Sequence, residues 1–401
     1  MKQPLLYLCH RIPYPPNKGD KIRSFNQLVY LAKHYEIYLG CFVDDPSDMA
    51  YMRELSQYVQ GMNVLPLSKR QATFRGLTSF FTGDPITLPY YFDQRMSLWV
   101  SNTLANFQIK NILVFSSSMA QYVDSPQYDM LHRVVDFVDL DSDKWRQYAD
   151  NKVFPMRQVY QREYRKLLKY EQDTSANFDA SVFISSLEVD LFNELSGAHS
   201  NAKVHAVGNG VDLAFFDPKV TNFDPSLRSG HPTIVFTGAM DYWANVDAVR
   251  WFVKHVWPLI TKRVRNPRLM IVGGNPTDKV KELEAFDGVE VTGRVKDIRQ
   301  YIQAGWVSVA PMRIARGVQN KVLEAMAMEV PVVASSLAME GLEQPTGCDV
   351  AVADEPQEFA DAVVERLQQR TTSAKNRKWV EEHYQWNAQL ALLHDLLECS
   401  K

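Results

Sequence analysis

Residues 307–335 read VSVAPMRIARGVQNKVLEAMAMEVPVVAS, and this stretch decides the fold class. Two short apolar runs, 307–312 and 331–336, flank NKVLEAMAM (320–328), a segment rich in strong helix formers. A strand, a helix and a second strand in this order form a βαβ unit, in which the two strands are parallel and the helix covers them. The stretch therefore predicts a parallel sheet in an α/β protein.

The same alternation of apolar runs and helical patterns continues through the rest of the chain. In the first half, we expect strands at residues 5–10, 36–43, 62–67, 111–117, 132–139 and 180–186. In the second half, we expect them at 232–240, 268–274, 289–293, 307–312 and 331–336. Residues 205–232 lack periodicity and are rich in glycine, proline, asparagine and aspartate, which predicts an interdomain linker.

A chain of 401 residues exceeds the size at which a single core usually stops growing. We therefore expect two doubly wound parallel-sheet domains, residues 1–208 and 209–379, facing a cleft that holds one part of a ligand on each side. Apolar residues recur at helical spacing near the C-terminus. We expect the helix at 380–401 to pack back on the first domain.

Composition and charge exclude several classes of function. The net charge of −3 gives no general attraction to nucleic acid, so we expect no nucleic-acid partner and only a local anion site. The four cysteines form no CxxC pair and have no neighbouring histidines at metal-ligand spacing, which argues against a zinc site or a disulfide framework. No apolar run approaches the roughly 20 residues of a spanning helix, and the N-terminal one is shorter than a signal-peptide core. The expected location is the cytoplasm.

Cationic side chains gather where the helix of residues 320–328 begins. Arg313 and Arg316 lie in the preceding loop, and Lys321 lies in the first turn. A helix N-terminus presents free N–H groups and a partial positive charge, so backbone near Gly317 and Val318 is expected to hold a diphosphate. Lys321 would neutralise that anion.

Glu324 follows Lys321 by three residues and lies on the same helix face. Its carboxylate is placed to accept hydrogen bonds from ribose hydroxyls, and Asn320 at the helix start joins the donor-side candidates. The structural alternative is an ordinary helix-surface pair, with the neighbouring arginines solvated.

Two more loops are expected at the same sheet edge. Gly238 allows backbone to approach a ligand, Asp241 and Asn245 face the cleft, and Asn245 or Asp247 caps a helix that begins near residue 246. Arg294 lies at the end of another strand, where a turn could hold a base. A turn glycine and a helix cap explain half of this pattern without a ligand.

The segment PYPPNKGDKIRS (13–24) supplies the first domain's candidate wall. Gly19 permits close approach of backbone, and Asp20 and Lys21 begin the following helix on the acceptor side. Ordinary surface charges are the alternative for Lys21 and Arg23.

Three carboxylates, Asp136, Asp139 and Asp141, crowd the end of the strand at 132–139. Asp139 is the candidate for an acceptor-side polar contact, although capping the next helix explains one carboxylate. His10, at the end of the first strand, is either a site residue or a packed core histidine.

The segments TGAMDYWANVDA (237–248), GRVKDI (293–298) and 309–335 together resemble the C-terminal domain of family 4 glycosyltransferases, which have the GT-B fold. The segments HRIPYPPNKGDKIRSFNQL (10–28) and VVDFVDLDSDKW (134–145) resemble, more narrowly, the sugar transferases associated with exosortase and PEP-CTERM exopolysaccharide loci. The similarity extends over nearly the whole chain.

The resemblance implies a nucleotide-sugar donor on the C-terminal domain, a glycan or lipid-linked acceptor on the N-terminal domain, and retention of anomeric configuration. It implies no metal and no cofactor beyond the donor itself. Glu324 matches the second glutamate of the family's E-x7-E motif, but Arg316 stands where the first is expected. Gly19, Arg316 and Lys321 are thus the candidate catalytic residues. The family's arginine and lysine pair after the domain's first strand is absent.

Two basic stretches suggest peripheral contact with the inner face of a membrane. The first, SKRQATFRGLTSFF (68–81), contains three phenylalanines, and the second, MRQVYQREYRKLLKYEQ (156–172), predicts an amphipathic helix. A solvated basic face is the alternative. Two other functions remain open at this point. A GT-B sugar-nucleotide epimerase would need acid and base carboxylates near the sugar, and a non-catalytic nucleotide-sugar binding protein would tolerate the altered motif.

Overall fold

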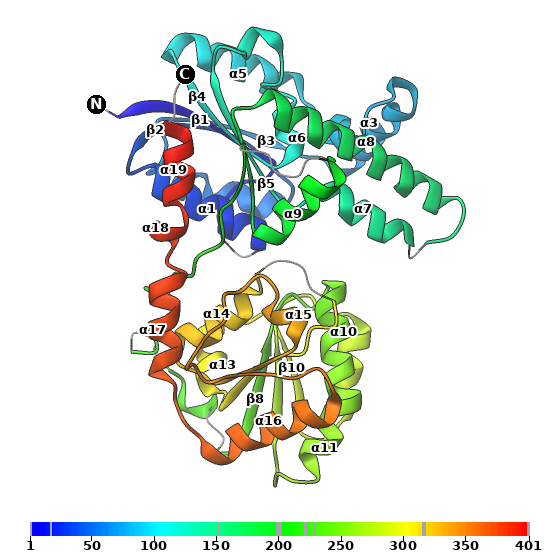
Figure 1. Ribbon diagram of the computed structural model, residues 1–401, viewed down its shortest axis with the longest axis vertical. Helices are drawn as coiled ribbons and strands as arrows, with labels where there is room; N and C mark the ends of the chain where they lie inside the picture. The colour runs from blue at the N-terminus through cyan, green and yellow to red at the C-terminus, as the bar shows by residue number, and fades with distance from the viewer. Residues whose placement is uncertain are drawn as a thin grey trace. The chain divides into compact units, whose positions relative to one another are not determined.

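The computed structural model describes residues 2–16, 18–150, 152–197, 203–219, 223–227, 230–314 and 318–398. The chain divides into two compact units (Figure 1). The N-terminal unit contains residues 1–208 and 389–401, and the C-terminal unit contains residues 209–388. Each unit has one sheet with helices packed on it.

The N-terminal unit has a seven-stranded sheet with the order β3-β2-β1-β4-β5-β6-β7. All its strand pairs are parallel. The strands are β1 Gln3–Cys9, β2 Tyr35–Val43, β3 Gly61–Pro66, β4 Asn111–Phe115, β5 His132–Val138, β6 Ala180–Phe183 and β7 Val204–Ala206. The helices are α1 Gly19–Leu31, η1 Pro46–Tyr51, α2 Met52–Leu55, α3 Lys69–Thr82, α4 Thr87–Tyr91, α5 Gln94–Phe107, α6 Ser117–Ala120, η2 Pro126–Tyr128, α7 Asp141–Asp150, α8 Met156–Asn177, α9 Ser186–Leu195 and α19 Ala391–Glu398.

The C-terminal unit has a six-stranded parallel sheet with the order β10-β9-β8-β11-β12-β13. The strands are β8 Thr233–Thr237, β9 Arg268–Val272, β10 Val289–Gly293, β11 Val307–Ala310, β12 Val332–Ala334 and β13 Val350–Val352. The helices are η3 Pro225–Leu227, α10 Trp243–Trp251, η4 Phe252–Val256, α11 Trp257–Thr261, α12 Asp278–Lys281, η5 Glu282–Ala285, α13 Ile298–Ala304, α14 Asn320–Ala327, α15 Ser336–Met339, α16 Pro356–Gln369, α17 Ala374–His383 and α18 Trp386–Gln389, the last at the boundary.

Burial on both faces explains why the strands are continuous apolar runs rather than alternating ones. Residues 5–9 of β1 and 234–236 of β8 are almost fully buried, as expected for a parallel sheet with helices on both sides. Helices such as α14 bury one stripe, here Val322, Leu323 and Met326, against the sheet. The sequence prediction of two doubly wound α/β domains is confirmed.

In each sheet the strand order reverses between the first and the fourth strand of the unit. These points lie between β1 and β4 in the N-terminal unit and between β8 and β11 in the C-terminal unit. Loops that leave adjacent strands in opposite directions open a crevice at the carboxyl edge there, and ligands of doubly wound sheets bind at that position. The C-terminal unit's reversal lies directly beside the stretch 307–335.

The helix that was expected to begin near residue 246 is not continuous. It starts earlier, at Trp243, and contains the π-helical turn η4 before α11 resumes with Pro258 in its first turn. Proline has no N–H, and its ring clashes with the carbonyl four residues back. The backbone hydrogen bonds of the preceding turn therefore span five residues instead of four.

The expectation that residues 380–401 pack on the N-terminal unit is wrong for residues 380–388. Arg377 of α17 donates to the carbonyls of Phe216 and Ala327, and Val211 pairs with Gln385, all within the C-terminal unit. Only α19 belongs to the N-terminal unit, where the carbonyl of Leu396 lies 2.7 Å from His132 Nε2.

Candidate functional site

Four loops of the C-terminal unit leave the carboxyl edge of its sheet next to the strand-order reversal. They follow β8, β9, β10 and β11, and they carry the expected donor-side residues of the chain. Ser335, which directly follows β12, holds the loop after β11 in place, because its Oγ donates to the carbonyl of Met312 at 2.6 Å. Helix α14 then begins at Asn320.

Lys321 is the central cation of this edge. Its Nζ donates to Asn245 Oδ1 at 2.6 Å, contacts Met312 Sδ at 3.5 Å, and lies 4.4 Å from the ring centroid of Phe236. The ammonium thus bridges the two sides of the reversal, with β8 and α10 on one side and β11 and α14 on the other. Within the described residues, it forms no ion pair. A positive charge held by an amide oxygen and an aromatic face keeps its attraction for an added anion.

Lys321 and Glu324 perturb one another through burial. Burial lowers the pKa of Lys321 from 10.5 to about 7, although Glu324 partly opposes this shift. Burial raises the pKa of Glu324 to about 7, and Lys321 opposes that shift in turn. Both charges are costly because desolvation disfavours them. An anion bound beside Lys321 would restore its charge.

Asn245 has a different role from the expected one. Helix α10 begins at Trp243 and its N-cap is Tyr242, so Asn245 does not cap the helix. Its side chain is buried, with Nδ2 donating to the carbonyl of Ala239 at 2.9 Å while Oδ1 accepts from Lys321. Asp247, the other capping candidate, also lies inside the helix. Asn245 therefore orients the lysine.

The packing around Asn245 requires a glycine at position 238. A Cβ at Gly238 would lie 2.7 Å from Asn245 Nδ2, and a Cβ at Gly273 would lie 1.7 Å from the carbonyl oxygen of Gly238. The two glycines let β8 and β9 end in direct backbone contact, with Gly238 N–H donating to the carbonyl of Val272. This contact leaves room for Asn245.

The other donor-side candidates lie around this centre with fewer constraints. Asp241 is exposed and accepts a hydrogen bond from Asn275 Nδ2 at 3.1 Å. Arg294 and Arg313 are exposed at the ends of β10 and β11. Val318 and Asn320 are half-buried, and Asn320 Oδ1 is buried without a hydrogen-bond partner among the described residues.

Two predicted residues, Arg316 and Gly317, lie outside the described residues, so their roles stay predictions.

In the N-terminal unit, most of the expected acceptor-side charges form ion pairs with residues of the same unit. Gly19 is the first residue of α1 and a Cβ there would meet no atom within 4 Å, so packing does not require the glycine. Lys21 is buried and pairs with Asp48. The interpretation of Lys21 as an ordinary surface charge is therefore wrong, and its charge is already compensated inside the unit.

The crowded carboxylates also have partners. Asp139 and Asp141 both bind Lys144 Nζ, at 3.0 and 2.9 Å. Burial disfavours the ammonium, but the two carboxylates raise the pKa of Lys144 well above its ordinary value. Asp136 is fully buried and binds Arg23 Nε at 2.7 Å. The sequence alone could not pair Asp136 with Arg23, because the two residues lie 113 positions apart.

A polar cluster at the reversal between β1 and β4 was only partly expected. Asp20 Oδ2 lies 2.7 Å from Arg11 Nη1 and 3.3 Å from His10 Nε2, and Arg11 Nε lies 3.2 Å from Asp44. Burial opposes ionisation of Asp20, but His10 and Arg11 hold its pKa well below the usual range. His10 stacks on Phe115 of β4. The signal in the sequence was the sharp change from apolar to polar residues after β1.

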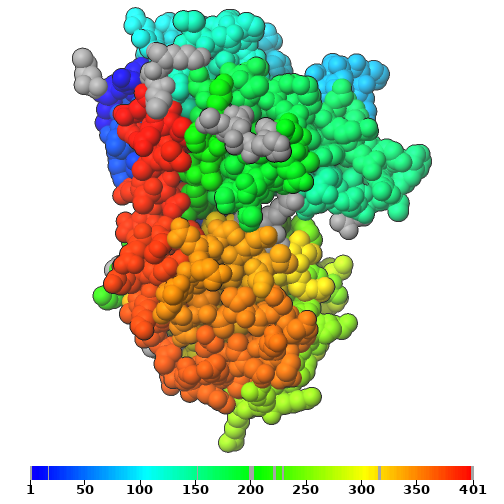
Figure 2. Space-filling model, in the orientation of Figure 1, coloured from blue at the N-terminus to red at the C-terminus, as the bar shows by residue number. Residues whose placement is uncertain are grey.

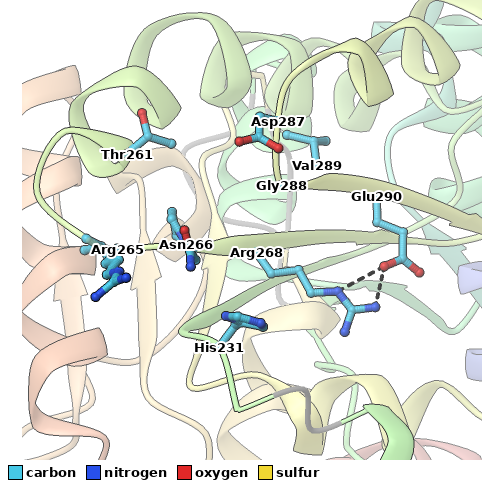
Figure 3. A pocket seen from close by; sticks show the side chains of 11 residues that line it. His231, Thr261, Arg265, Asn266, Arg268, Asp287, Gly288, Val289 and Glu290 are labelled. Atoms are coloured by element: carbon cyan, nitrogen blue, oxygen red, sulfur yellow. Dashed lines mark hydrogen bonds and ion pairs between the residues drawn. The ribbon is translucent and has the colours of Figure 1, made fainter.

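A separate cavity of about 680 Å³ lies at the opposite edge of the C-terminal unit's sheet. It is lined by residues at the starts of β8, β9 and β10, including His231, Arg265 and Asp287 (Figure 3). The guanidinium of Arg268 points to Glu290 and is neutralised by it. Because ligands of such sheets bind at the carboxyl edge, we assign no donor site to this cavity.

Among the described residues, no group of three or more His, Cys, Asp or Glu side chains is arranged to hold a metal ion. In that same part of the chain, no helix is both long enough and apolar enough to cross a membrane.

Comparisons with known proteins agree with this architecture. Residues 231–369, which contain the whole carboxyl edge of the C-terminal sheet, match the family model "Glycosyl transferases group 1". An uncharacterized 44.6 kDa protein in the cps region of Klebsiella pneumoniae is 23% identical over 225 residues, and the match spans only about half of each chain, 54% of both.

Solved structures with the same fold cover nearly the whole chain. Sucrose-phosphate synthase from Thermosynechococcus elongatus matches with a TM-score of 0.67 at 16% identity, covering 98% of each chain. Anabaena HepE in complex with UDP matches with a TM-score of 0.65 at 15% identity, covering 98% of this chain and 100% of HepE. WaaG, a glycosyltransferase involved in lipopolysaccharide biosynthesis, matches with a TM-score of 0.60 at 13% identity, covering 99% and 97%. The chain therefore has the GT-B fold, and its residues 231–369 are similar to the group 1 glycosyl transferases.

Proposed function

We propose that the protein transfers a sugar from a nucleoside-diphosphate sugar to a glycan or lipid-linked acceptor. The observation that carries this proposal is Lys321, whose ammonium is held by Asn245 at the strand-order reversal and lacks a carboxylate partner among the described residues. The match of residues 231–369 to group 1 glycosyl transferases supports it, because Lys321 lies inside the matched region. HepE, which has the same fold, was solved with UDP and with UDP-glucose.

In this proposal, the donor diphosphate lies against Lys321 and the start of α14. The diphosphate contacts the ammonium, Arg313 and the backbone near Val318, and Glu324 accepts hydrogen bonds from the ribose. Arg294 and Asp241 border the nucleoside side of the loops. Arg316 and Gly317 complete the phosphate contacts.

We propose a retaining transfer by front-face attack. The bond between the sugar's anomeric carbon and the diphosphate oxygen breaks, and the acceptor oxygen bonds to the same face of that carbon. The acceptor's hydroxyl proton passes to the departing diphosphate. The protein then contributes positioning and neutralises charge on the leaving group, and it needs neither a protein nucleophile nor a metal. A covalent glycosyl adduct trapped on a carboxylate would contradict this mechanism.

The acceptor side rests on sequence resemblance and on the relatives' descriptions. We propose a role in exopolysaccharide biosynthesis at the cytoplasmic side of the cell membrane. A lipopolysaccharide-forming glycosyltransferase among the structures with this fold, and a relative in a cps region, support this proposal.

A thermal-shift screen against UDP, GDP, ADP and dTDP tests the donor site. We expect one of these diphosphates to raise the melting temperature of the C-terminal unit by roughly 5–10 °C at a concentration of 100 times Kd, because a ligand of the folded state adds about 2.7 kcal/mol. The Lys321→Ala and Glu324→Ala variants should lose the shift. Lys262→Ala removes an exposed lysine just after α11, near the sheet's other edge, and should keep it. No shift with any diphosphate would contradict the donor site.

The affinity for the donor should depend on pH through Lys321. In the Glu324→Gln variant, which removes the carboxylate that raises the lysine pKa, we expect that pKa to fall below its wild-type value of about 7. Kd should therefore begin to rise below pH 7, by roughly tenfold per pH unit, because bound diphosphate raises the lysine pKa and binding takes up a proton. Calorimetry between pH 6.5 and 9 in buffers of different ionisation enthalpy measures both effects. Lys321→Arg, which stays charged, should show no such rise.

A further inference from the structure

The helix α3 exposes large apolar side chains on one face. Phe74 is 73% exposed, Leu77 52% and Phe81 92%. The spacing of these residues places them along one stripe of the helix, and Arg70 precedes them on the same stripe. Soluble surfaces rarely expose adjacent apolar side chains to this extent without a partner.

The charged residues of α3 are all cations, and the exposed Asp84 follows directly after Gly83 at its end. Helix α3 carries Lys69, Arg70 and Arg75 and contains no acidic residue, whereas the whole chain has a net charge of −3. Lys166 of α8 adds an exposed cation next to Gly83, which ends α3. The positive charge on this face is therefore local, and the partner that it complements is anionic as well as apolar.

Helix α3 is held in place by contacts with α8 and α4. Arg162 of α8 donates to the carbonyls of Ser79 and Asp84, and its guanidinium lies 4.9 Å from the centre of the Phe80 ring. Arg75 donates to the carbonyls of Pro89 and Tyr90. The stripe is thus presented without the ordering cost of a flexible loop.

Figure 1 shows α3 beside α8, at the edge of the N-terminal unit, and Figure 2 shows its light-blue residues projecting from that edge. Phe81 is 92% exposed, so no other described residue of the unit covers it. A projecting rigid helix of this kind can insert its apolar side chains to the depth of the lipid headgroups while its cations face them.

We propose that the exposed face of α3 docks the N-terminal unit on an anionic phospholipid bilayer. Phe74, Leu77 and Phe81 enter the interface, and Lys69 and Arg70 bind headgroup phosphates. The docking would bring a lipid-linked acceptor to the N-terminal unit. Only this purpose rests on the proposed function. The contact itself needs no nucleotide.

Flotation of the whole protein with vesicles tests this proposal. We expect binding to phosphatidylcholine vesicles that contain roughly 30% phosphatidylglycerol, an anionic lipid. We expect little binding to vesicles of phosphatidylcholine alone. The Phe74→Ser and Phe81→Ser double variant should abolish binding. Lys69→Gln and Arg70→Gln should each weaken it by about fivefold, and added salt should weaken it further.

Met130→Ser is the matched control, because it removes an apolar side chain that is 87% exposed but lies outside α3. It should bind like the wild type. All these positions are exposed, so circular dichroism should show unchanged folding. Failure of the wild type to float, or equal binding to neutral vesicles, would overturn the proposal. So would a double variant that keeps floating but changes a wild-type dimer into a monomer, since a second copy would then cover the stripe. A negative result here leaves the nucleotide shifts intact, so the two proposals fail separately.

Discussion

Replacing Lys321 with alanine is expected to lower kcat for sugar transfer by about 10²- to 10³-fold, the usual cost of removing one group that stabilises charge developing in a transition state. The loss follows from the position of the ammonium, which Asn245 holds at 2.6 Å and which no carboxylate neutralises within the described residues. Charge grows on the diphosphate as the sugar leaves, so the interaction strengthens during the reaction. Steady-state kinetics with the diphosphate sugar identified by thermal shift would measure the effect.

Two further variants separate this role from simple binding. Asn245→Ala keeps the lysine but removes the oxygen that orients it, so we expect a smaller fall in kcat. Lys262→Ala should leave kcat and KM unchanged. If Lys321→Ala raises KM while kcat stays the same, the lysine binds ground state and transition state equally, and its proposed part in the chemistry is wrong.

The second large effect is expected in the core of the N-terminal unit. Asp136 and Arg23 are both fully buried, and Asp136 also accepts from Gln27 Nε2 and from the N–H of Val138. Asp136→Leu should lower the free energy of unfolding of this unit by roughly 3–5 kcal/mol, because it leaves the guanidinium buried without its carboxylate. Chemical denaturation of the whole chain measures the loss.

The two units must be distinguished in that experiment, because a two-unit chain need not unfold in one step. The nucleotide that stabilises the C-terminal unit shifts only the transition of that unit, which identifies the other one. The Arg23→Met and Asp136→Leu double variant removes both charges and should recover most of the loss. Asp173→Leu makes the same substitution in the exposed pair with Lys169 and should cost less than about 1 kcal/mol. Equal losses for Asp136→Leu and Asp173→Leu would contradict the argument.

The buried ion pairs also show where prediction from sequence failed. Lys21 was predicted on the acceptor side, Arg23 as a surface charge and Asp136 among carboxylates at a strand end. In the structure, Lys21 binds Asp48 and Arg23 binds Asp136 inside the unit. Partners separated by 27 and 113 positions are brought together by the order of strands in the sheet. No local pattern reports such a pairing, and a buried charge looks the same as a surface charge in the sequence.

Asn245 gives the same lesson in the C-terminal unit. Its place before an apolar run suggested a helix cap, but α10 starts at Trp243, three residues before the expected start. The amide instead lies against Lys321, which is 76 positions along the chain. The glycine at 238 was predicted to allow close approach of a ligand, and that stays a prediction. What approaches it, however, is Asn245 and the backbone near Gly273.

The sequence by itself determined the α/β class, the two parallel sheets and nearly every strand, because a strand buried on both faces is a continuous apolar run and this signal is local. It also placed Lys321 and Glu324 on one face of α14, which helix periodicity alone dictates. Only the tertiary structure decided which charges are neutralised and which stay available. That depends on contacts between distant segments, and burial shifts the pKa of Lys321 and of Glu324 to about 7 only after those segments have packed together.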